Sequence, residues 1–212
     1  MSPCGLMVHL LHFPVRTLGP GTRVGVWCQG CTIRCPGCIT PESREFFPER
    51  AVPVDDLAKR ILSYFNDFNF KEPRPELPAG LTVSGGEPFD QPEPLLELLR
   101  ILNDGGVSDV LIYSGYSAED LLARHPDLPR LAAALVDGPF EANNPTDAAW
   151  KGSDNQRLHL WRPEFEGRYR DWTRSNARRL QFVTDGRHRK ILIGIPRQGD
   201  VKRLKELSDS EN

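Results

Sequence analysis

Hydrophobic and polar positions along the chain alternate between the period of a strand and the period of a helix. Residues 22–28 (TRVGVWC) follow the turn-forming Gly19-Pro20-Gly21 and predict a strand that ends in a loop. Gly85-Gly86 stops a second β-rich run in the same way. This second run is the strand predicted at 81–84, and a third strand is predicted at 109–115. Helices with recurring apolar positions are predicted at 53–68, 95–102 and 118–124. This half of the chain therefore predicts repeated strand and helix units.

The second half of the chain has a less regular pattern. Residues 131–136 fit either a helix end or a strand, and Val136-Asp137-Gly138-Pro139 is typical of a strand terminus. Residues 141–156 are polar and predict a loop. Strands are then predicted at 157–161, 179–184 and 190–195, and a closing helix at 201–207.

Alternating strands and helices predict an α/β fold with a mainly parallel sheet, in which ligand sites gather at the carboxyl ends of the strands. A complete eight-unit barrel needs about 250 residues, and this chain has 212. We therefore expect a single domain over residues 1–212 that forms a partial, open β/α barrel, with its core at about 7–160 and closing elements at about 161–212.

The composition restricts the classes of partner. Lysine and arginine number 27 against 29 acidic residues, so overall charge favours neither nucleic acid nor a membrane surface. The apolar run 6–15 is interrupted by His9, His12 and Pro14 and is too short to span a bilayer. We expect a soluble cytoplasmic protein. Residues 157–190 hold ten basic and four acidic residues, which fits either a docking surface or a solvated face.

Four of the five cysteines lie between Cys28 and Cys38, a spacing natural for metal thiolates in a reducing compartment. Cys31, Cys35 and Cys38 can wrap a compact site from one loop, and their soft sulfur ligands select an iron–sulfur cluster or zinc. A four-iron cluster held by three cysteines keeps one iron open for substrate. The alternative is a structural zinc knuckle in which Cys28 is the fourth ligand.

Ser84-Gly85-Gly86-Glu87-Pro88 follows a predicted strand, where bare glycine backbone can approach a ligand closely, although a glycine pair alone also fits a plain turn. Together with the cysteine triad, this segment resembles the radical S-adenosylmethionine (SAM) superfamily. That superfamily has a C-x3-C-x2-C cluster motif and a second strand that ends in GGEP.

Further segments are similar to the short activating proteins of the anaerobic ribonucleotide reductase activase branch, over about residues 7–160. They are Gly19-Pro20-Gly21, Trp27-Cys28-Gln29-Gly30-Cys31, Cys35-Pro36-Gly37-Cys38, Tyr113-Ser114-Gly115-Tyr116, Val136-Asp137-Gly138-Pro139 and Trp150-Lys151-Gly152-Ser153-Asp154-Asn155-Gln156, with a looser echo in Ile193-Gly194-Ile195-Pro196. The chain departs from the pattern at Cys28, where an apolar residue is expected, and we interpret Cys28 as a small buried hydrophobe.

The resemblance implies a [4Fe-4S] cluster on Cys31, Cys35 and Cys38 and SAM on its open iron, where one electron cleaves the sulfonium to methionine and a 5′-deoxyadenosyl radical. It also implies that a set of strand-end and loop residues contacts SAM: Gly85, Gly86 and Glu87 at the methionine group, Ser114 and Asp137 at the carboxylate or ribose, and Ser153 and Asn155 in a loop at the SAM side or the cavity mouth. Asp137 also fits a simple turn residue, and the 152–156 segment also fits a helix cap or polar loop. The catalytic residues stay unassigned.

The resemblance further implies a larger protein partner that receives a glycyl radical, and an external one-electron donor such as flavodoxin or ferredoxin. No membrane or nucleic-acid partner is expected. Two alternatives stay open at this point. One is a radical SAM enzyme that modifies a peptide, RNA or small molecule, and the other is a noncatalytic metal-binding interaction module.

Overall fold

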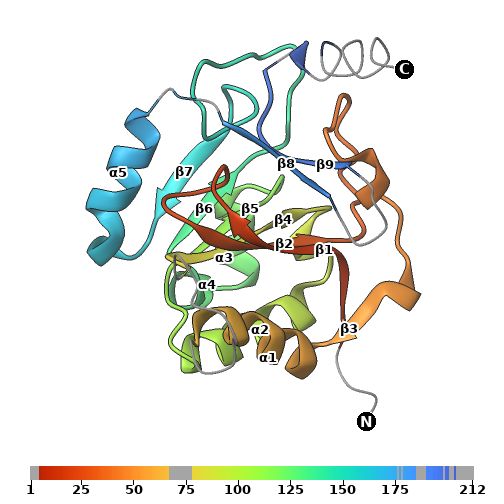
Figure 1. The fold of residues 1–212 in the computed structure, drawn as a ribbon, viewed down its shortest axis with the longest axis vertical. Helices are drawn as coiled ribbons and strands as arrows, with labels where there is room; N and C mark the ends of the chain where they lie inside the picture. Colours follow the sequence, from red (N-terminus) through yellow and green to blue (C-terminus); the bar gives the residue numbers. More distant parts are fainter. Residues whose placement is uncertain are drawn as a thin grey trace.

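The computed structural model describes residues 5–66, 78–175, 177, 179–184, 190–197, 199–200 and 203. Figure 1 shows an α/β fold around one mixed sheet, with a separate two-stranded hairpin near the carboxyl terminus. The strands are β1 Gly5–Val15, β2 Arg23–Cys28, β3 Ala51–Pro53, β4 Gly80–Gly85, β5 Val110–Tyr113, β6 Ala134–Asp137, β7 Arg157–Leu160, β8 Leu180–Thr184 and β9 Lys190–Gly194. The helices are α1 Val54–Phe65, α2 Pro92–Asp104, α3 Ala118–Arg124, α4 Leu128–Leu131 and α5 Glu166–Arg174.

The main sheet has seven strands in the order β3-β1-β2-β4-β5-β6-β7. Its four central strands, β2, β4, β5 and β6, run parallel. The flanking strands β1, β3 and β7 are antiparallel to their neighbours. The expected parallel sheet is therefore confirmed for the centre, and the complete sheet is mixed. The carboxyl ends of the parallel strands meet at one edge, as the pattern predicted.

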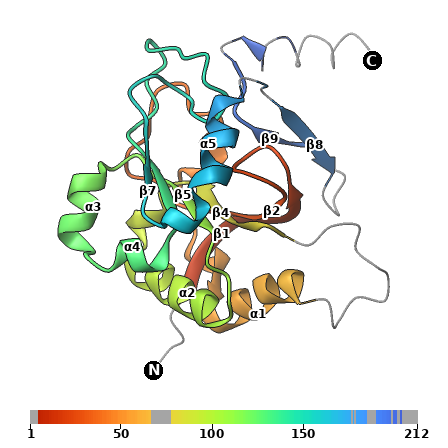
Figure 2. The same cartoon turned by 90° about the vertical axis from the view of Figure 1, so that its left-hand side faces the viewer.

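The two faces of β2 pack against different elements. Val24, Val26 and Cys28 belong to the core cluster that the sheet forms with α1 and α2. Trp27 points to the other face, where it packs with Val15, Leu18 and Ile193 of β9. Figure 2 shows α1 and α2 next to each other below the sheet and the β8–β9 hairpin above it. Because side chains alternate along a strand, the parity of a position decides which of these two environments it enters.

Most predicted elements are confirmed, with differences that have physical reasons. The run 6–15 forms β1, which was not predicted because histidine and proline interrupt its pattern. The pairing of β1 with β2 is itself irregular between Val8 and Leu10 and between His12 and Val15. Segment 131–136 divides between the end of α4 and the start of β6. Helix α5 was missed because its sequence is strongly polar. Except for residue 203, the predicted closing helix 201–207 lies outside the described residues.

A buried ionic network joins the strands at the amino-terminal edge of the sheet. The Arg23 side chain is fully buried and donates to Thr82 Oγ1 at 2.8 Å, to the Leu81 carbonyl at 2.7 Å and to Asp109 Oδ1 at 3.0 Å. Tyr169 and Arg168 of α5 also donate to the Asp109 carboxylate, each at 2.7 Å. This network connects β2, β4, the start of β5 and α5 at the edge opposite the strands' carboxyl ends.

None of the helices in the described ranges is long and apolar enough to cross a membrane.

Candidate iron–sulfur site

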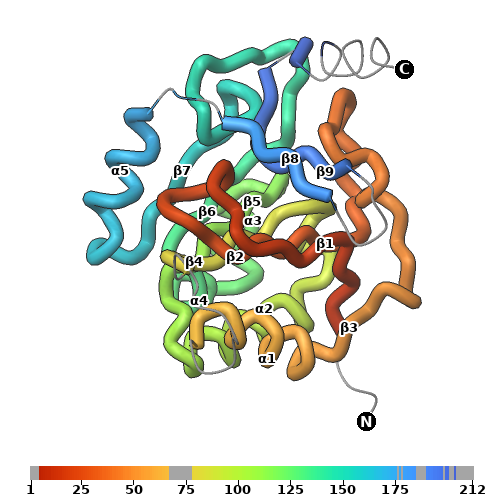
Figure 3. The backbone as a smooth tube through the Cα atoms, in the orientation of Figure 1, coloured from red at the N-terminus to blue at the C-terminus, as the bar shows by residue number. Residues whose placement is uncertain are grey.

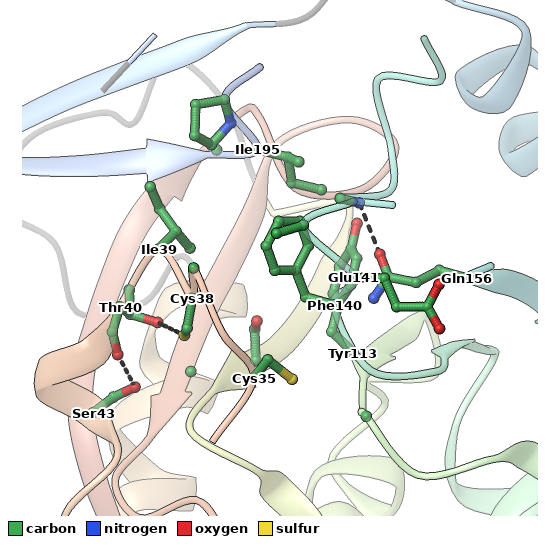
Figure 4. A pocket seen from close by; sticks show the side chains of 18 of the residues that line it. Cys35, Cys38, Ile39, Thr40, Ser43, Tyr113, Phe140, Glu141, Gln156 and Ile195 are labelled. Carbon is green, nitrogen blue, oxygen red and sulfur yellow. Dashed lines mark hydrogen bonds between the residues drawn. The ribbon is translucent and has the colours of Figure 1, made fainter. Parts of the chain in front are cut away.

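A cavity of about 640 Å³ opens at the carboxyl ends of β2, β4 and β5. Its walls come from segments that are far apart in the sequence, and Figure 4 shows several of their side chains. The lining residues include Cys31, Cys35, Cys38, Arg44, Gly85, Gly86, Glu87, Tyr113, Ser114, Gly115, Gly138, Phe140, Gly152, Gln156, Ile193, Ile195, Pro196 and Arg197. The structure therefore brings the predicted cysteine triad and the predicted glycine turn to one cavity.

The cysteine loop is held in place by the elements around it. It begins directly after β2, where the amides of Gly30 and Cys31 donate to the carbonyls of Ser43 and Arg44, both at 2.8 Å. The Thr32 amide donates to the Asp90 carboxylate at 2.6 Å. The Arg44 guanidinium donates to the carbonyl of Cys35. The loop is thus held on both sides by hydrogen bonds within the protein.

The donor set of this loop fits an iron–sulfur cluster. All three thiols are partly exposed and line the cavity, so a cluster seated there has both soft ligands and access for a substrate. Burial raises the pKa of the Cys31 thiol, while the backbone amides of Arg34 and Ile33 act in the opposite direction. Those amides favour the thiolate, which is the form that ligates iron.

Cys28 occupies a different environment. Its side chain is fully buried in the core between the sheet and the helices, it does not line the cavity, and burial raises its thiol pKa strongly. This placement agrees with its interpretation as a small hydrophobe and leaves the zinc knuckle without its fourth thiolate. Within the described ranges, no three Cys, His, Asp or Glu side chains are placed to hold a single metal ion.

Gly85 and Gly86 are required by backbone packing. Gly85 has a φ of +103°, and a Cβ there would lie 2.4 Å from the Cys28 nitrogen. A Cβ on Gly86 would lie 2.1 Å from the carbonyl oxygen of Gly30, next to the first cysteine of the loop. The glycine pair was interpreted as room for a ligand. The structure adds that the same residues let the end of β4 pack directly against the start of the cysteine loop.

Glu87 joins the ends of β4 and β5. Its carboxylate is 2% exposed and accepts from Ser114 Oγ at 2.8 Å, from the Gly115 amide at 2.8 Å and from the Phe89 amide at 3.0 Å. The side chain of Ser114 is thereby committed to Glu87. Burial raises the pKa of the Glu87 carboxyl to about 7, although the hydrogen bonds from Gly115, Phe89 and Ser114 lower it.

This raised pKa predicts a pH-dependent stability. Below pH about 4.5 both states of the chain hold the proton, and as the pH rises toward about 7 the unfolded chain releases its proton first. The free energy of unfolding should therefore fall over this range because of Glu87. In Glu87→Gln this loss should be absent, so the stability of the variant relative to the parent should improve between pH 5 and pH 8. Urea unfolding at pH 5 and pH 8 measures the free energy of unfolding of parent and variant. The same difference between the two proteins at both pH values would contradict the prediction.

The three remaining candidate residues do not line the cavity. One Asp137 carboxylate oxygen accepts from the Ala118 amide at 2.8 Å at the start of α3, and the other lies 3.1 Å from His159 Nε2. Ser153 is fully buried, and its hydroxyl accepts from the Glu141 amide at 3.0 Å. Asn155 donates to the Pro139 carbonyl at 2.8 Å. These contacts shape the loop beside the cavity, and contact of the three side chains with SAM stays a prediction.

Several cavity residues were not among the predicted site residues. Gln156 lines the cavity, accepts from the Gly152 amide at 2.7 Å and donates to the Gly138 carbonyl at 2.9 Å. Its signal was present, because it ends the polar segment in which Ser153 and Asn155 were chosen. Phe140 gave no local signal, and Ile193-Gly194-Ile195-Pro196 gave only a loose resemblance without a role, since only the tertiary fold brings both to the cysteines.

A single loop with three available thiols, placed against glycine backbone at parallel strand ends, defines an iron–sulfur protein with one cluster. Residues 17–159 match the family described as 4Fe-4S single cluster domain, and the chain belongs to this family. This match confirms the iron–sulfur interpretation at the level of the family, and the assignment of Cys31, Cys35 and Cys38 as the ligands stays a prediction.

Named relatives extend this result. The chain is 29% identical over 154 residues to the anaerobic ribonucleoside-triphosphate reductase-activating protein of Escherichia coli (strain K12), covering 70% of this chain and 95% of the relative. The protein of the same name from Haemophilus influenzae is 29% identical over 163 residues, covering 74% and 99%. The pyruvate formate-lyase-activating enzyme of Clostridium pasteurianum is 32% identical over 122 residues, covering 56% and 48%. The recognition of a radical SAM activating protein, with a [4Fe-4S] cluster and SAM as cofactors, is confirmed.

Proposed function

We propose that this chain generates a glycyl radical on a larger partner protein by reductive cleavage of SAM at a [4Fe-4S] cluster on Cys31, Cys35 and Cys38. One observation carries this proposal: the three thiols and the glycine turn line one cavity at the strand ends, while Cys28 lies in the core. The relatives support the partner class, since they are named as activating proteins of ribonucleoside-triphosphate reductase and of pyruvate formate-lyase.

The residues of the chain would prepare the site for this chemistry. When bound, the cluster supplies one electron and an open iron position for SAM. Gly85 and Gly86 bring bare backbone beside the cysteine loop. Glu87 fixes Ser114 and the Gly115 amide at the neighbouring strand end. Apolar side chains such as Phe140 and Ile195 limit the access of water to the cavity.

We also propose that the open sheet acts as a partial β/α barrel of the radical SAM type, formed by the whole chain as one domain. The sheet order ends at β3 and β7, which leaves a lateral side through which a polypeptide loop of the partner could enter. A donor such as flavodoxin or ferredoxin would supply the electron. The basic stretch 157–190 stays a proposed docking surface, although Arg168 within it is already bonded to Asp109.

Anaerobic reconstitution tests the proposed function. We expect about four irons and matching sulfide per chain, slow SAM cleavage when the protein is reduced alone, and coupled cleavage with a glycyl-radical partner. Electron paramagnetic resonance should then show the doublet of a glycyl radical on the partner. Stoichiometric zinc without iron would contradict the cluster. Modification of a free peptide, RNA or metabolite with stoichiometric 5′-deoxyadenosine, and no partner radical, would contradict the activase assignment.

A further inference from the structure

The β8–β9 hairpin lies outside the part of the chain that defines the family. The family match ends at residue 159, and the Escherichia coli relative is covered over 95% of its own length by an alignment that includes only 70% of this chain. Nevertheless, Leu192, Ile193, Gly194, Ile195, Pro196 and Arg197 line the same cavity as the three cysteines. A segment beyond the matched residues 17–159 therefore forms part of the cavity wall.

The hairpin is anchored to the rest of the fold. Ile193 is 1% exposed and packs against Val15, Leu18 and Trp27. The Gln181 side chain of β8 donates to the Pro14 carbonyl at 2.7 Å and accepts from the Arg16 amide at 3.2 Å. Figure 3 shows the hairpin crossing above β1 and β2. These contacts give the wall a defined position over the carboxyl end of β2.

The chain turns toward the cavity at Gly194. This residue has a φ of +130°, and a Cβ there would lie 2.7 Å from the carbonyl oxygen of Arg179. Glycine therefore permits a turn after β9 that leads into Ile195 and Pro196. In Figure 4 the side chains of Ile39, Phe140 and Ile195 lie around the space above Cys35 and Cys38. From Leu192 to Pro196 the wall is entirely apolar.

We propose that this hairpin is a specificity element of the proposed activase, in which Ile195, Pro196 and Ile39 form an apolar subsite for a residue that flanks the target glycine. The inference rests on the proposed function. A glycine must lie deep in the cavity to react, so its neighbouring side chains meet the cavity wall. The wall has no charged group from Leu192 to Pro196, and Arg197 follows it at the cavity. A flanking side chain that lies against Ile195 and Pro196 is therefore favoured when it is apolar, because a carboxylate at that place would lose water against an apolar surface.

Two glycine peptides test this subsite without knowledge of the partner. Ac-Ala-Val-Gly-Val-Ala-NH2 and Ac-Ala-Asp-Gly-Asp-Ala-NH2, each with a dideuterated glycine, are added to the anaerobically reconstituted protein with SAM. Isothermal titration calorimetry measures the dissociation constants, and mass spectrometry measures deuterium in 5′-deoxyadenosine. We expect the valine peptide to bind about tenfold more tightly and to be the preferred deuterium donor.

Two variants of Ile195 and one control variant locate the effect. Ile195→Ala should reduce the tenfold preference to near parity, and Ile195→Asp should weaken binding of the valine peptide further. Ile191→Ala is the control, because Ile191 lies in the same hairpin and packs against the same cluster but does not line the cavity. This control should keep the preference of the parent. An equal loss in Ile191→Ala would show a structural effect and overturn the inference.

The outcomes separate the two proposals. A parent protein that holds its cluster and cleaves SAM, yet binds both peptides equally or binds neither, overturns the specificity element and leaves the proposed function intact. A parent protein that holds no cluster and cleaves no SAM overturns the proposed function itself.

Discussion

Replacement of Cys31, Cys35 or Cys38 by alanine should abolish the iron–sulfur cluster, whereas Cys28→Ala should retain it. Each of the three residues supplies one of the partly exposed thiols at the cavity, and no other cysteine among the described residues lines it. A three-thiolate site that loses one ligand leaves a second iron without protein sulfur. Iron and sulfide content after anaerobic reconstitution, together with the visible absorption of the cluster, measures the result.

Cys28→Ala is the matched control, because it removes a thiol from the core at a position adjacent to the loop. Its expected cost is in stability, about 1 kcal/mol, since it removes a sulfur from a fully buried site. The assignment of ligands would be wrong if Cys28→Ala lost its iron while Cys31→Ala kept it.

Arg23→Met should destabilise the fold by about 3 kcal/mol, because it removes the buried partner of Asp109, while Arg168 and Tyr169 still donate to that carboxylate. The Arg23 side chain is fully buried, and Asp109 is 4% exposed. Methionine also leaves the carbonyl of Leu81 and the hydroxyl of Thr82 without their donor. Unfolding in urea or by heat, followed by circular dichroism, measures this loss.

Arg170→Met provides the comparison for this prediction. Arg170 pairs with Glu166 at 3.7 Å on the surface of α5, and both side chains are more than half exposed. Solvent screening limits such a pair, so we expect a change within about 0.5 kcal/mol. A cost for Arg23→Met no larger than that for Arg170→Met would refute a stabilising role for the buried network.

The sequence determined the features that depend on neighbouring residues. Helix α3 begins and ends where its apolar spacing and the cap Ser117 indicate. Strands β2 and β4 follow from β-branched runs that stop at loops or glycines. The cysteine triad could also be recognised, because all three ligands lie within eight residues and their spacing carries the chemistry. The alternation of side chains along β2 also indicated that Cys28 is buried, since Cys28 lies on the same face as Val24 and Val26.

The tertiary structure alone decided how distant segments meet at the site. The Glu87 carboxylate meets Ser114 and Gly115 only because β4 and β5 are neighbours in the sheet. Glycine is required at position 86 because the backbone of Gly30, which follows the end of β2, approaches it closely. Ile195 lies more than 150 residues beyond Cys38 and reaches the cavity through the docking of the β8–β9 hairpin. Local patterns report which face of an element is buried, whereas the partners on that face are fixed by strand order and packing, which no short segment encodes.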